Sequence, residues 1–147
     1  MKYIRIIPAI LLTVTLLASC SSSRSKLYNN NVYHWGYIDD NVTQYEIAVF
    51  EYLNTKTPKS LCDLITTYRE IMEDCKDNER MIPPGICAEF GYLLLNPNTE
   101  AIFFEYATSE QKNFMKDKNF QDYGKQLIEK EKVLYPESEV YLNRVIK

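Results

Sequence analysis

The sequence has few of the residues that build catalytic or metal sites. Its 147 residues include one histidine and four cysteines, and His34 has no partner at the spacing typical of metal ligands. No nucleophile, base and orienting residue form a recognisable set. We therefore predict no catalytic residue, no metal and no dissociable cofactor.

The acids Glu89, Glu129 and Glu131 leave one enzymatic alternative open, because two carboxyl groups can act as a general acid and base. Charges on predicted helices usually form a solvated face instead. We expect a protein that is not an enzyme.

Excess positive charge is also lacking. The formal net charge is −3, and removing Lys2 and Arg5 with a leader would make it more negative. A nucleic-acid-binding protein usually shows a basic stripe or patch. We predict no nucleic-acid partner.

The chain has no hydrophobic run long enough to cross a bilayer. The longest run, Ile6 to Leu17, falls short of the roughly 20 apolar residues that a spanning helix needs and contains Pro8. With Lys2 and Arg5 before it and small residues after it, this layout is typical of a secretory signal peptide.

The end of this run, Leu17-Ala18-Ser19-Cys20, resembles the lipobox of bacterial lipoproteins. The resemblance implies that residues 1–19 are removed and that Cys20 receives a diacylglycerol and an N-acyl chain such as palmitate. Two or more acyl chains hold a protein stably on a membrane. An ordinary signal peptide, with Cys20 left free, is the alternative.

Residues 20–31 follow as the lipidated cysteine and a polar tether that is too poor in apolar residues to fold. No acid stands between Ser21 and Lys26. By resemblance to lipoprotein sorting signals, this implies a lipid-anchored protein of the outer membrane that faces the periplasm. The remaining residues, 32–147, form the predicted domain.

Three further cysteines leave their pairing open. Cys62 and Cys75 fall on one predicted helix, about 20 Å apart, which is beyond the reach of a disulfide. Cys75 and Cys87 could bridge two helices across a hairpin. Alternatively, all three are small buried apolar groups.

An aromatic segment, Val32 to Ile38, opens the domain and contains the only tryptophan. We expect it to be extended or a loop. Tyr33, Trp35 and Tyr37 are candidate binding residues for a partner or a glycan. The alternative is that these rings form a lid over the hydrophobic core, because large rings bury most of their area where they can.

Apolar residues at helical spacing predict a series of helices after this segment. Asn41, with Gln44 three residues on, predicts the start of the first helix, which runs to about Leu53. Thr57-Pro58 opens the second helix. That helix carries the cleanest apolar stripe in the chain, formed by Leu61, Leu64, Ile65, Tyr68, Ile71, Met72 and Cys75.

The third helix begins at Pro84-Gly85 and ends at Asn96-Pro97. We expect Gly91, inside this helix, to let another helix approach closely. A last long helix, from about Tyr123 to Leu134, is broken at Pro136. Ser138 then caps a short final helix.

These helices resemble a tetratricopeptide unit, a helix-turn-helix repeat. Gly91 and Pro136 lie about 21 residues farther apart than the matching residues of one such unit. We place an insertion at about 96–121, with helical segments at 98–106 and 109–118. In an alternative, residues 99–106 begin the displaced second helix. The expected fold is all-α, a short helical bundle built on a tetratricopeptide-like helix-turn-helix.

Three motifs resemble a family of small bacterial lipoproteins of unknown function, often encoded beside curli-secretion-channel-like lipoproteins. They are Tyr33-His34-Trp35-Gly36, Pro83-Pro84-Gly85 with Ala88 and Gly91, and Glu131 to Ser138. Ile38 and Glu89 depart from the family pattern, where the resemblance implies Tyr and His. The resemblance implies a helical envelope protein and supplies no catalytic residues.

Together these features predict a non-enzymatic outer-membrane lipoprotein that acts as a protein-interaction adaptor in the cell envelope. A channel-forming lipoprotein is a candidate partner. The alternative function is a glycan- or peptidoglycan-binding module that uses Tyr33, Trp35 and Tyr37.

Overall fold

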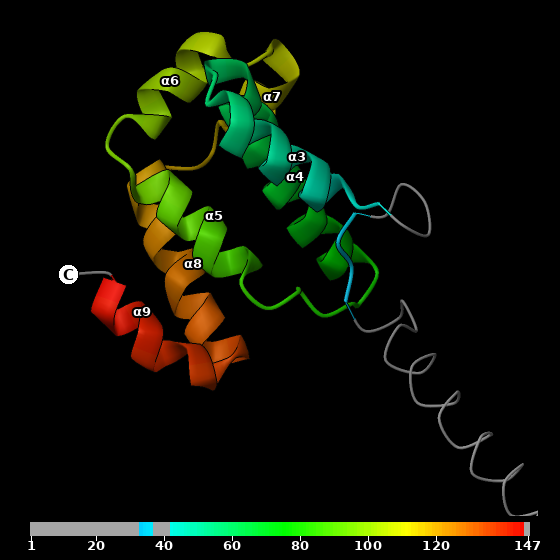
Figure 1. Cartoon of the computed structure of the whole chain (residues 1–147), viewed down its shortest axis with the longest axis vertical. Coiled ribbons are helices and arrows are strands. Elements are labelled where there is room, and N and C mark those ends of the chain that lie inside the picture. The colour runs from blue at the N-terminus through cyan, green and yellow to red at the C-terminus, as the bar shows by residue number, and fades with distance from the viewer. Residues whose placement is uncertain (1–32, 37–41, 146–147) are drawn as a thin grey trace, which may run out of the picture. The chain divides into compact units, whose positions relative to one another are not determined.

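The structure is a computed structural model that describes residues 33–36 and 42–145. Its described part is helical, which confirms the expected all-α class. The helices, in chain order, are α3 (Gln44–Thr55), α4 (Pro58–Asp77), α5 (Ile86–Leu95), α6 (Thr99–Tyr106), α7 (Ser109–Met115), α8 (Phe120–Leu134), the 3-10 helix η1 (Pro136–Ser138) and α9 (Glu139–Val145). Figure 1 shows α6 and α7 together at one end of the bundle and α9 toward the other.

The first helix begins later than the sequence predicted. Thr43, rather than Asn41, is the N-cap of α3, and its hydroxyl accepts the backbone N–H of Glu46 at 3.0 Å. The Glu46 carboxylate accepts the backbone N–H of Thr43 in return, also at 3.0 Å. A threonine followed three residues later by a glutamate satisfies both ends of a capping box, so this pair defines the start. Asn41 itself lies outside the described residues.

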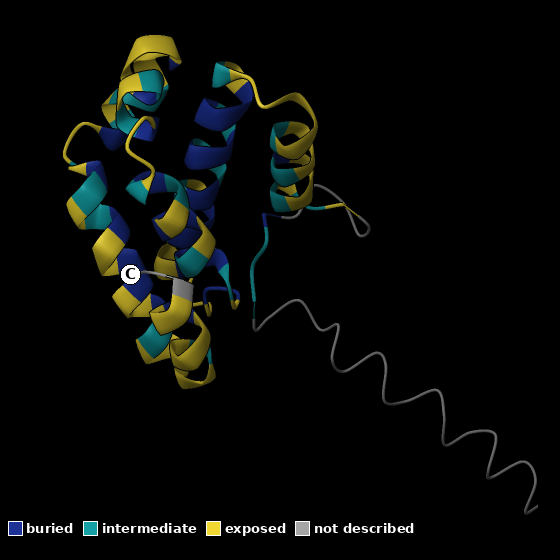
Figure 2. Cartoon of the chain, turned by 60° about the vertical axis from the view of Figure 1, so that its left-hand side comes forward, coloured by how far each residue is buried: buried dark blue, intermediate teal, exposed yellow. Residues whose placement is uncertain are grey.

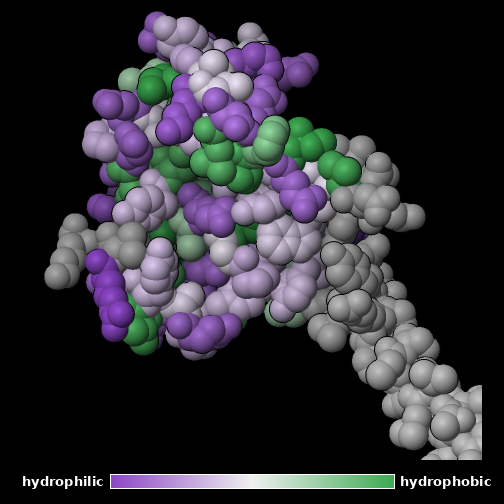
Figure 3. Space-filling model, viewed as in Figure 1, coloured by the Kyte–Doolittle hydropathy of each residue, from purple (hydrophilic) through white to green (hydrophobic). Residues whose placement is uncertain are grey.

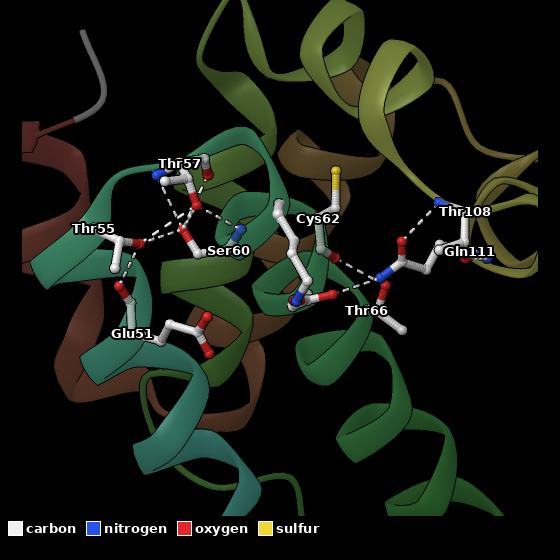
Figure 4. A network of polar contacts seen from close by, with 10 residues as sticks. Glu51, Thr55, Thr57, Ser60, Cys62, Thr66, Thr108 and Gln111 are labelled. Carbon is white, nitrogen blue, oxygen red and sulfur yellow. Dashed lines mark hydrogen bonds and ion pairs between the residues drawn. The ribbon is translucent and has the colours of Figure 1, made fainter.

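A hydrogen-bonded turn joins α3 to α4. The Thr57 hydroxyl accepts the backbone N–H of Ser60 at 3.2 Å, and the Thr55 hydroxyl donates to the Ser60 hydroxyl at 2.9 Å. These three side chains point toward one another in Figure 4. The N-cap Thr57 and Pro58 in the first turn confirm the predicted start of the second helix.

The apolar stripe of α4 forms the centre of the core. All seven predicted stripe residues are buried. Burying a large aliphatic side chain contributes about 1.5–3 kcal/mol, so α4 is a main source of stability. Figure 2 shows α4 largely in the colour of buried residues, whereas α3 is mostly intermediate and exposed.

Helices α5 and α8 cross at two glycines, which confirms the prediction for Gly91. A Cβ atom on Gly91 would lie 2.7 Å from the carbonyl oxygen of Gly124, and a Cβ on Gly124 would lie 2.9 Å from the carbonyl oxygen of Gly91. Backbone atoms cannot rotate out of the way as a side chain can. The two helices therefore pack at a distance that only glycine permits at these positions.

The predicted insertion is helical, and its two segments are α6 and α7, both packed on α4. Gln111 of α7 donates from its side-chain amide to the Asp63 carboxylate of α4 at 2.9 Å. The α7 end of this contact is seen in Figure 4. Of the helices that follow α5, α8 is the one that packs most extensively against it, whereas α6 packs mainly on α4.

The last elements pack back on α8. Pro136 opens η1 and α9 follows at Glu139. Ser138 stands directly before α9 as predicted, but its hydroxyl has no hydrogen-bond partner among the described residues. The predicted side-chain cap is therefore wrong, because the η1 turn already continues into the first turn of α9.

The three motifs of the sequence analysis meet at one end of α4 and α5. Tyr33 forms an isolated β-bridge with Met81. The Tyr135 hydroxyl donates to the carbonyl oxygen of Ile82, and the buried Glu131 carboxylate accepts the backbone N–H of Gly85 at 2.7 Å. These contacts hold the Pro83-Pro84-Gly85 turn, which sets the direction of α5 against α8.

Candidate functional site

An open groove lies between α3, α4, α5 and α9. Its volume is about 870 Å³, which falls in the range of ligand-binding pockets. In Figure 1, α3 and α9 lie on either side of α5. The described residues that line the groove are Tyr45, Val49, Tyr52, Leu53, Leu64, Tyr68, Ala88, Glu89, Tyr92, Leu93, Leu95, Asn96, Pro97, Tyr141 and Leu142.

Helical periodicity brings these side chains to one face of each helix. Tyr45, Val49 and Tyr52 are spaced four and three residues apart on α3, so they point the same way. On α5, one face likewise carries Glu89, Tyr92 and Leu93, which are spaced three and four residues apart. The face of α3 that carries Tyr45, Val49 and Tyr52 thus lines the groove, and of the α3 residues only Ala48 is buried.

A carboxylate held by two tyrosines lies in the wall of the groove. Oε2 of Glu89 accepts the Tyr45 hydroxyl at 2.8 Å and the Tyr68 hydroxyl at 2.7 Å. Oε1 of Glu89 accepts no hydrogen bond from the residues that the structure describes. Burial, followed by the hydrogen bond and charge of Glu89, raises the pKa of Tyr45. Burial and then the Glu89 charge raise the pKa of Tyr68, so both hydroxyls remain donors at neutral pH.

The groove is aromatic and carries charge of one sign. Five tyrosines line it, and Glu89 is the ionisable acid among the lining residues. None of the described lining residues is Lys, Arg or His. The groove therefore presents apolar surface, ring faces and one negative charge to an occupant.

No protein family, curated protein or solved structure matches the chain. The function must therefore be inferred from the groove and its residues.

A row of ring contacts ties the groove to the core. The ring centroids of Trp35 and Tyr45 lie 5.0 Å apart, those of Tyr45 and Tyr68 lie 6.0 Å apart, and Tyr68 stacks on Phe90 at 5.4 Å. Tyr68 is only 3% exposed. Such contacts stabilise a pair by about 0.5–1.5 kcal/mol beyond area burial, so they fix Tyr45 and the position of Glu89.

Two of the predicted aromatic binding residues, Tyr33 and Trp35, are not among the residues that line the groove. Tyr33 and Trp35 are half-buried, and Trp35 packs against the core through Tyr45. Tyr37 lies outside the described residues. The tyrosines of α3, α5 and α9 were not identified as site residues from the sequence, although Tyr45 and Tyr52 recur with Val49 at helical spacing.

His34 lies at the end of α4 rather than in the groove. Its Nε2 is 3.0 Å from the Asp74 carboxylate, and its Nδ1 is 3.0 Å from Nη1 of Arg80. Burial lowers the pKa of His34, with the charge of Arg80 acting in the same direction and that of Asp74 against it. These contacts fix the 33–36 segment on α4.

The three cysteines that the structure describes, Cys62, Cys75 and Cys87, are free thiols and are buried. The Cys75 Sγ contacts the carbonyl oxygens of Met81 at 3.5 Å and His34 at 3.8 Å. Burial raises the pKa of Cys87 to about 12, so this thiol stays protonated. The structure thus shows the second of the two alternatives, three small buried groups.

The three acids considered for catalysis have separate surroundings. Glu129 pairs with Lys132 at 2.7 Å on the exposed side of α8. Glu131 caps the turn at Gly85, and Glu89 binds the two tyrosines. Within residues 33–36 and 42–145, no group of His, Cys, Asp and Glu is arranged to hold a metal ion.

No helix in the described part of the chain is both long and apolar enough to span a membrane. The predicted signal peptide, Cys20 and the tether lie outside the described residues. They remain predictions from the sequence.

Proposed function

We propose that the chain is a lipid-anchored, non-enzymatic protein of the bacterial outer membrane that binds a segment of another envelope protein in the α3–α5–α9 groove. The observation that carries this proposal is the groove itself. Its size, openness and apolar lining suit a peptide segment. A channel-forming lipoprotein is a candidate source of that segment.

The arrangement of the helices supports a role in protein interaction. Helix α3 pairs with α4, and α5 pairs with α8. The groove is lined mainly by α3 and α5, the first helix of each pair. Stacked helical repeats bind partners on a concave face built in this manner. We infer that the two pairs stack as tetratricopeptide-like units, with α6 and α7 inserted into the second unit.

The chemistry of the surface supports the same role. Tyrosines are enriched at protein interfaces, where they bury a large apolar area and keep a hydrogen-bonding hydroxyl. Exposed apolar residues of α3 extend this surface, and Phe50 is 71% exposed. Hydrophobic residues gather on the face seen in Figure 3, over the region of α3. A contiguous exposed apolar surface typically marks an interaction site.

The alternative function, glycan or peptidoglycan binding through Tyr33, Trp35 and Tyr37, receives no specific support. Stacking on a sugar needs an open ring face, and Trp35 already packs on Tyr45. Titration with cell-wall fragments checks this alternative directly, since Trp35 is the single tryptophan and its fluorescence would report binding.

Site-specific photo-crosslinking in intact cells tests the binding role. A photoreactive residue at Tyr92, which is 49% exposed in the groove, should give a discrete crosslinked product. The same residue at Lys125, exposed on α8 outside the groove, is the matched control. An Ala88→Phe variant, which fills the groove from α5, should abolish the Tyr92 product while the protein still melts cooperatively.

A product that forms equally from Lys125, or that survives Ala88→Phe, would contradict the proposed groove. The membrane anchor has its own test. Mass spectrometry of the membrane-extracted protein should show Cys20 as the first residue with its acyl chains. An unmodified Cys20 thiol on a freely soluble protein would overturn the envelope setting.

A further inference from the structure

We infer that the groove selects a partner segment that carries an arginine, whose guanidinium pairs with Glu89 while apolar neighbours fill the walls on either side. This inference rests on the proposed function and deepens it by naming the chemistry of the bound segment.

The first step is the unneutralised charge of Glu89. None of the ion pairs among the described residues includes this carboxylate. Tyr45 and Tyr68 both donate to Oε2, which leaves Oε1 without a hydrogen-bond donor among the described residues. Two neutral donors orient a carboxylate but do not cancel its charge. A bound segment that covered Glu89 without supplying a cation would bury that charge unpaired, at a large cost.

The second step is the fixed position of the carboxylate. Tyr68 is buried in the core and stacks on Phe90, and the ring of Tyr45 contacts those of Tyr68 and Trp35. The two hydroxyls thus hold Glu89 from a rigid base. A pre-positioned acceptor loses less side-chain entropy on binding than a free surface glutamate does.

The third step distinguishes arginine from other cations. A guanidinium is planar, is always charged, stacks on aromatic rings and is more weakly hydrated than an ammonium. Glu89 lines the groove together with Tyr92 and Tyr141, whose exposed rings offer faces for such stacking.

The fourth step distinguishes a peptide from a small organic cation. Much of the lining is aliphatic and belongs to all four helices of the groove. A choline-sized cation at Glu89 would leave most of this apolar surface in water. A chain with apolar residues on both sides of an arginine would cover it, and burial of that surface would drive binding.

Selection from a displayed library of random linear peptides tests this inference. The full mature domain is used as bait, in wild-type form and as Glu89→Gln. A Gln side-chain oxygen still accepts the two tyrosine hydroxyls, so this variant should fold, which a thermal melt checks. Glu129→Gln, which changes an exposed acid on α8, is the matched control.

Peptides selected on the wild-type protein and on Glu129→Gln should be enriched in arginine flanked by apolar residues, and the enrichment should vanish with Glu89→Gln. Replacing the arginine of a selected peptide by citrulline, its neutral analogue, should weaken binding about tenfold, because a hydrogen bond to a charged group is lost. This second measurement needs no protein variant.

Peptides that bind in the groove without a basic residue would overturn the arginine inference and leave the proposed function standing. A selection that yields no groove-binding peptide, together with no Tyr92 crosslink, would overturn both. Displacement of selected peptides by choline at comparable affinity would show that the site takes a small quaternary ammonium, and would also overturn the inference.

Discussion

Two helix pairs of this molecule are built in opposite ways. Helices α5 and α8 approach so closely that glycines face each other at the crossing, and their inner faces bury aromatic and aliphatic residues such as Phe90, Phe120 and Leu127. Helix α3, in contrast, buries only Ala48. The first pair and α4 supply stability, whereas α3 keeps an apolar surface available for contact.

Helix α3 is held mainly by its ends and by ring contacts. A capping box at Thr43 fixes its start, and the Thr55 and Ser60 hydroxyls tie its end to α4. Between these points, Tyr45 contacts Trp35 and Tyr68. This mode of attachment fixes the position of α3 on α4 and leaves Phe50 and Leu53 exposed. The comparison makes four predictions, ordered by their expected effect on stability.

Adding one methyl group at the α5–α8 crossing should have the largest effect. Gly91→Ala places a Cβ against the backbone oxygen of Gly124, so the helices must separate. We expect a loss of about 3 kcal/mol in the free energy of unfolding, typical of overpacking that forces a backbone shift. Urea denaturation followed by circular dichroism measures it. Gln126→Ala, at an exposed position of α8, should change little. Equal stability of the two variants would show that the crossing is not tightly packed.

Removing the buried carboxylate of α8 should have the next largest effect. Glu131 is 2% exposed and accepts the Gly85 N–H at the turn before α5. Glu131→Ala leaves that donor without its partner and should cost about 2 kcal/mol. Glu129→Ala, an exposed acid on the same helix, is the control and should change the free energy of unfolding by less than about 0.5 kcal/mol. If Glu131→Ala left the free energy of unfolding unchanged, the turn would not depend on this contact.

The dense half of the fold was the more predictable from sequence. The α4 stripe repeats over about four turns and all its members are buried, and the role of Gly91 followed from a glycine inside a helix. Both signals are local and periodic. The start of α3 was misplaced because Asn41 and Thr43 both offer a cap, and the better partner three residues on, Glu46, decides between them.

The groove could not be predicted from sequence because it depends on contacts between distant residues. Glu89 stood out as a departure from the family pattern, but its partner Tyr45 lies 44 residues away and Tyr68 lies 21 residues away. Helical periodicity shows that Tyr45 and Tyr52 share a face. Periodicity alone does not show whether this face borders an open groove opposite α5 and α9 or is covered by another helix.

A smaller effect on stability should come from the protonation of His34, in the segment 33–36 that packs on α4. The fold lowers the pKa of His34 from its ordinary 6.5, mainly through burial. The folded state therefore binds this proton less readily than the unfolded state does. The contribution of neutral His34 to stability is therefore present above about pH 6.5 and is lost as the pH falls through the folded-state pKa.

The free energy of unfolding of wild type minus that of His34→Gln should therefore decrease from about pH 8 to about pH 5. The difference isolates His34 from the carboxylates, which titrate in both proteins. An increase toward low pH would show that pairing with Asp74 outweighs burial at this site.

The smallest expected effect on stability is at α3, where the expected effect on binding is large. Leu53 lines the groove and is 61% exposed, so Leu53→Ser removes little buried surface and should change the free energy of unfolding by less than about 0.5 kcal/mol. The Tyr92 photo-crosslink should nevertheless weaken strongly, because the partner would lose an apolar wall. Glu110→Ser, on α7 and away from the groove, should leave the crosslink intact. If Leu53→Ser destabilised the fold as much as Gly91→Ala does, α3 would be part of the core, and the contrast between the two helix pairs would disappear.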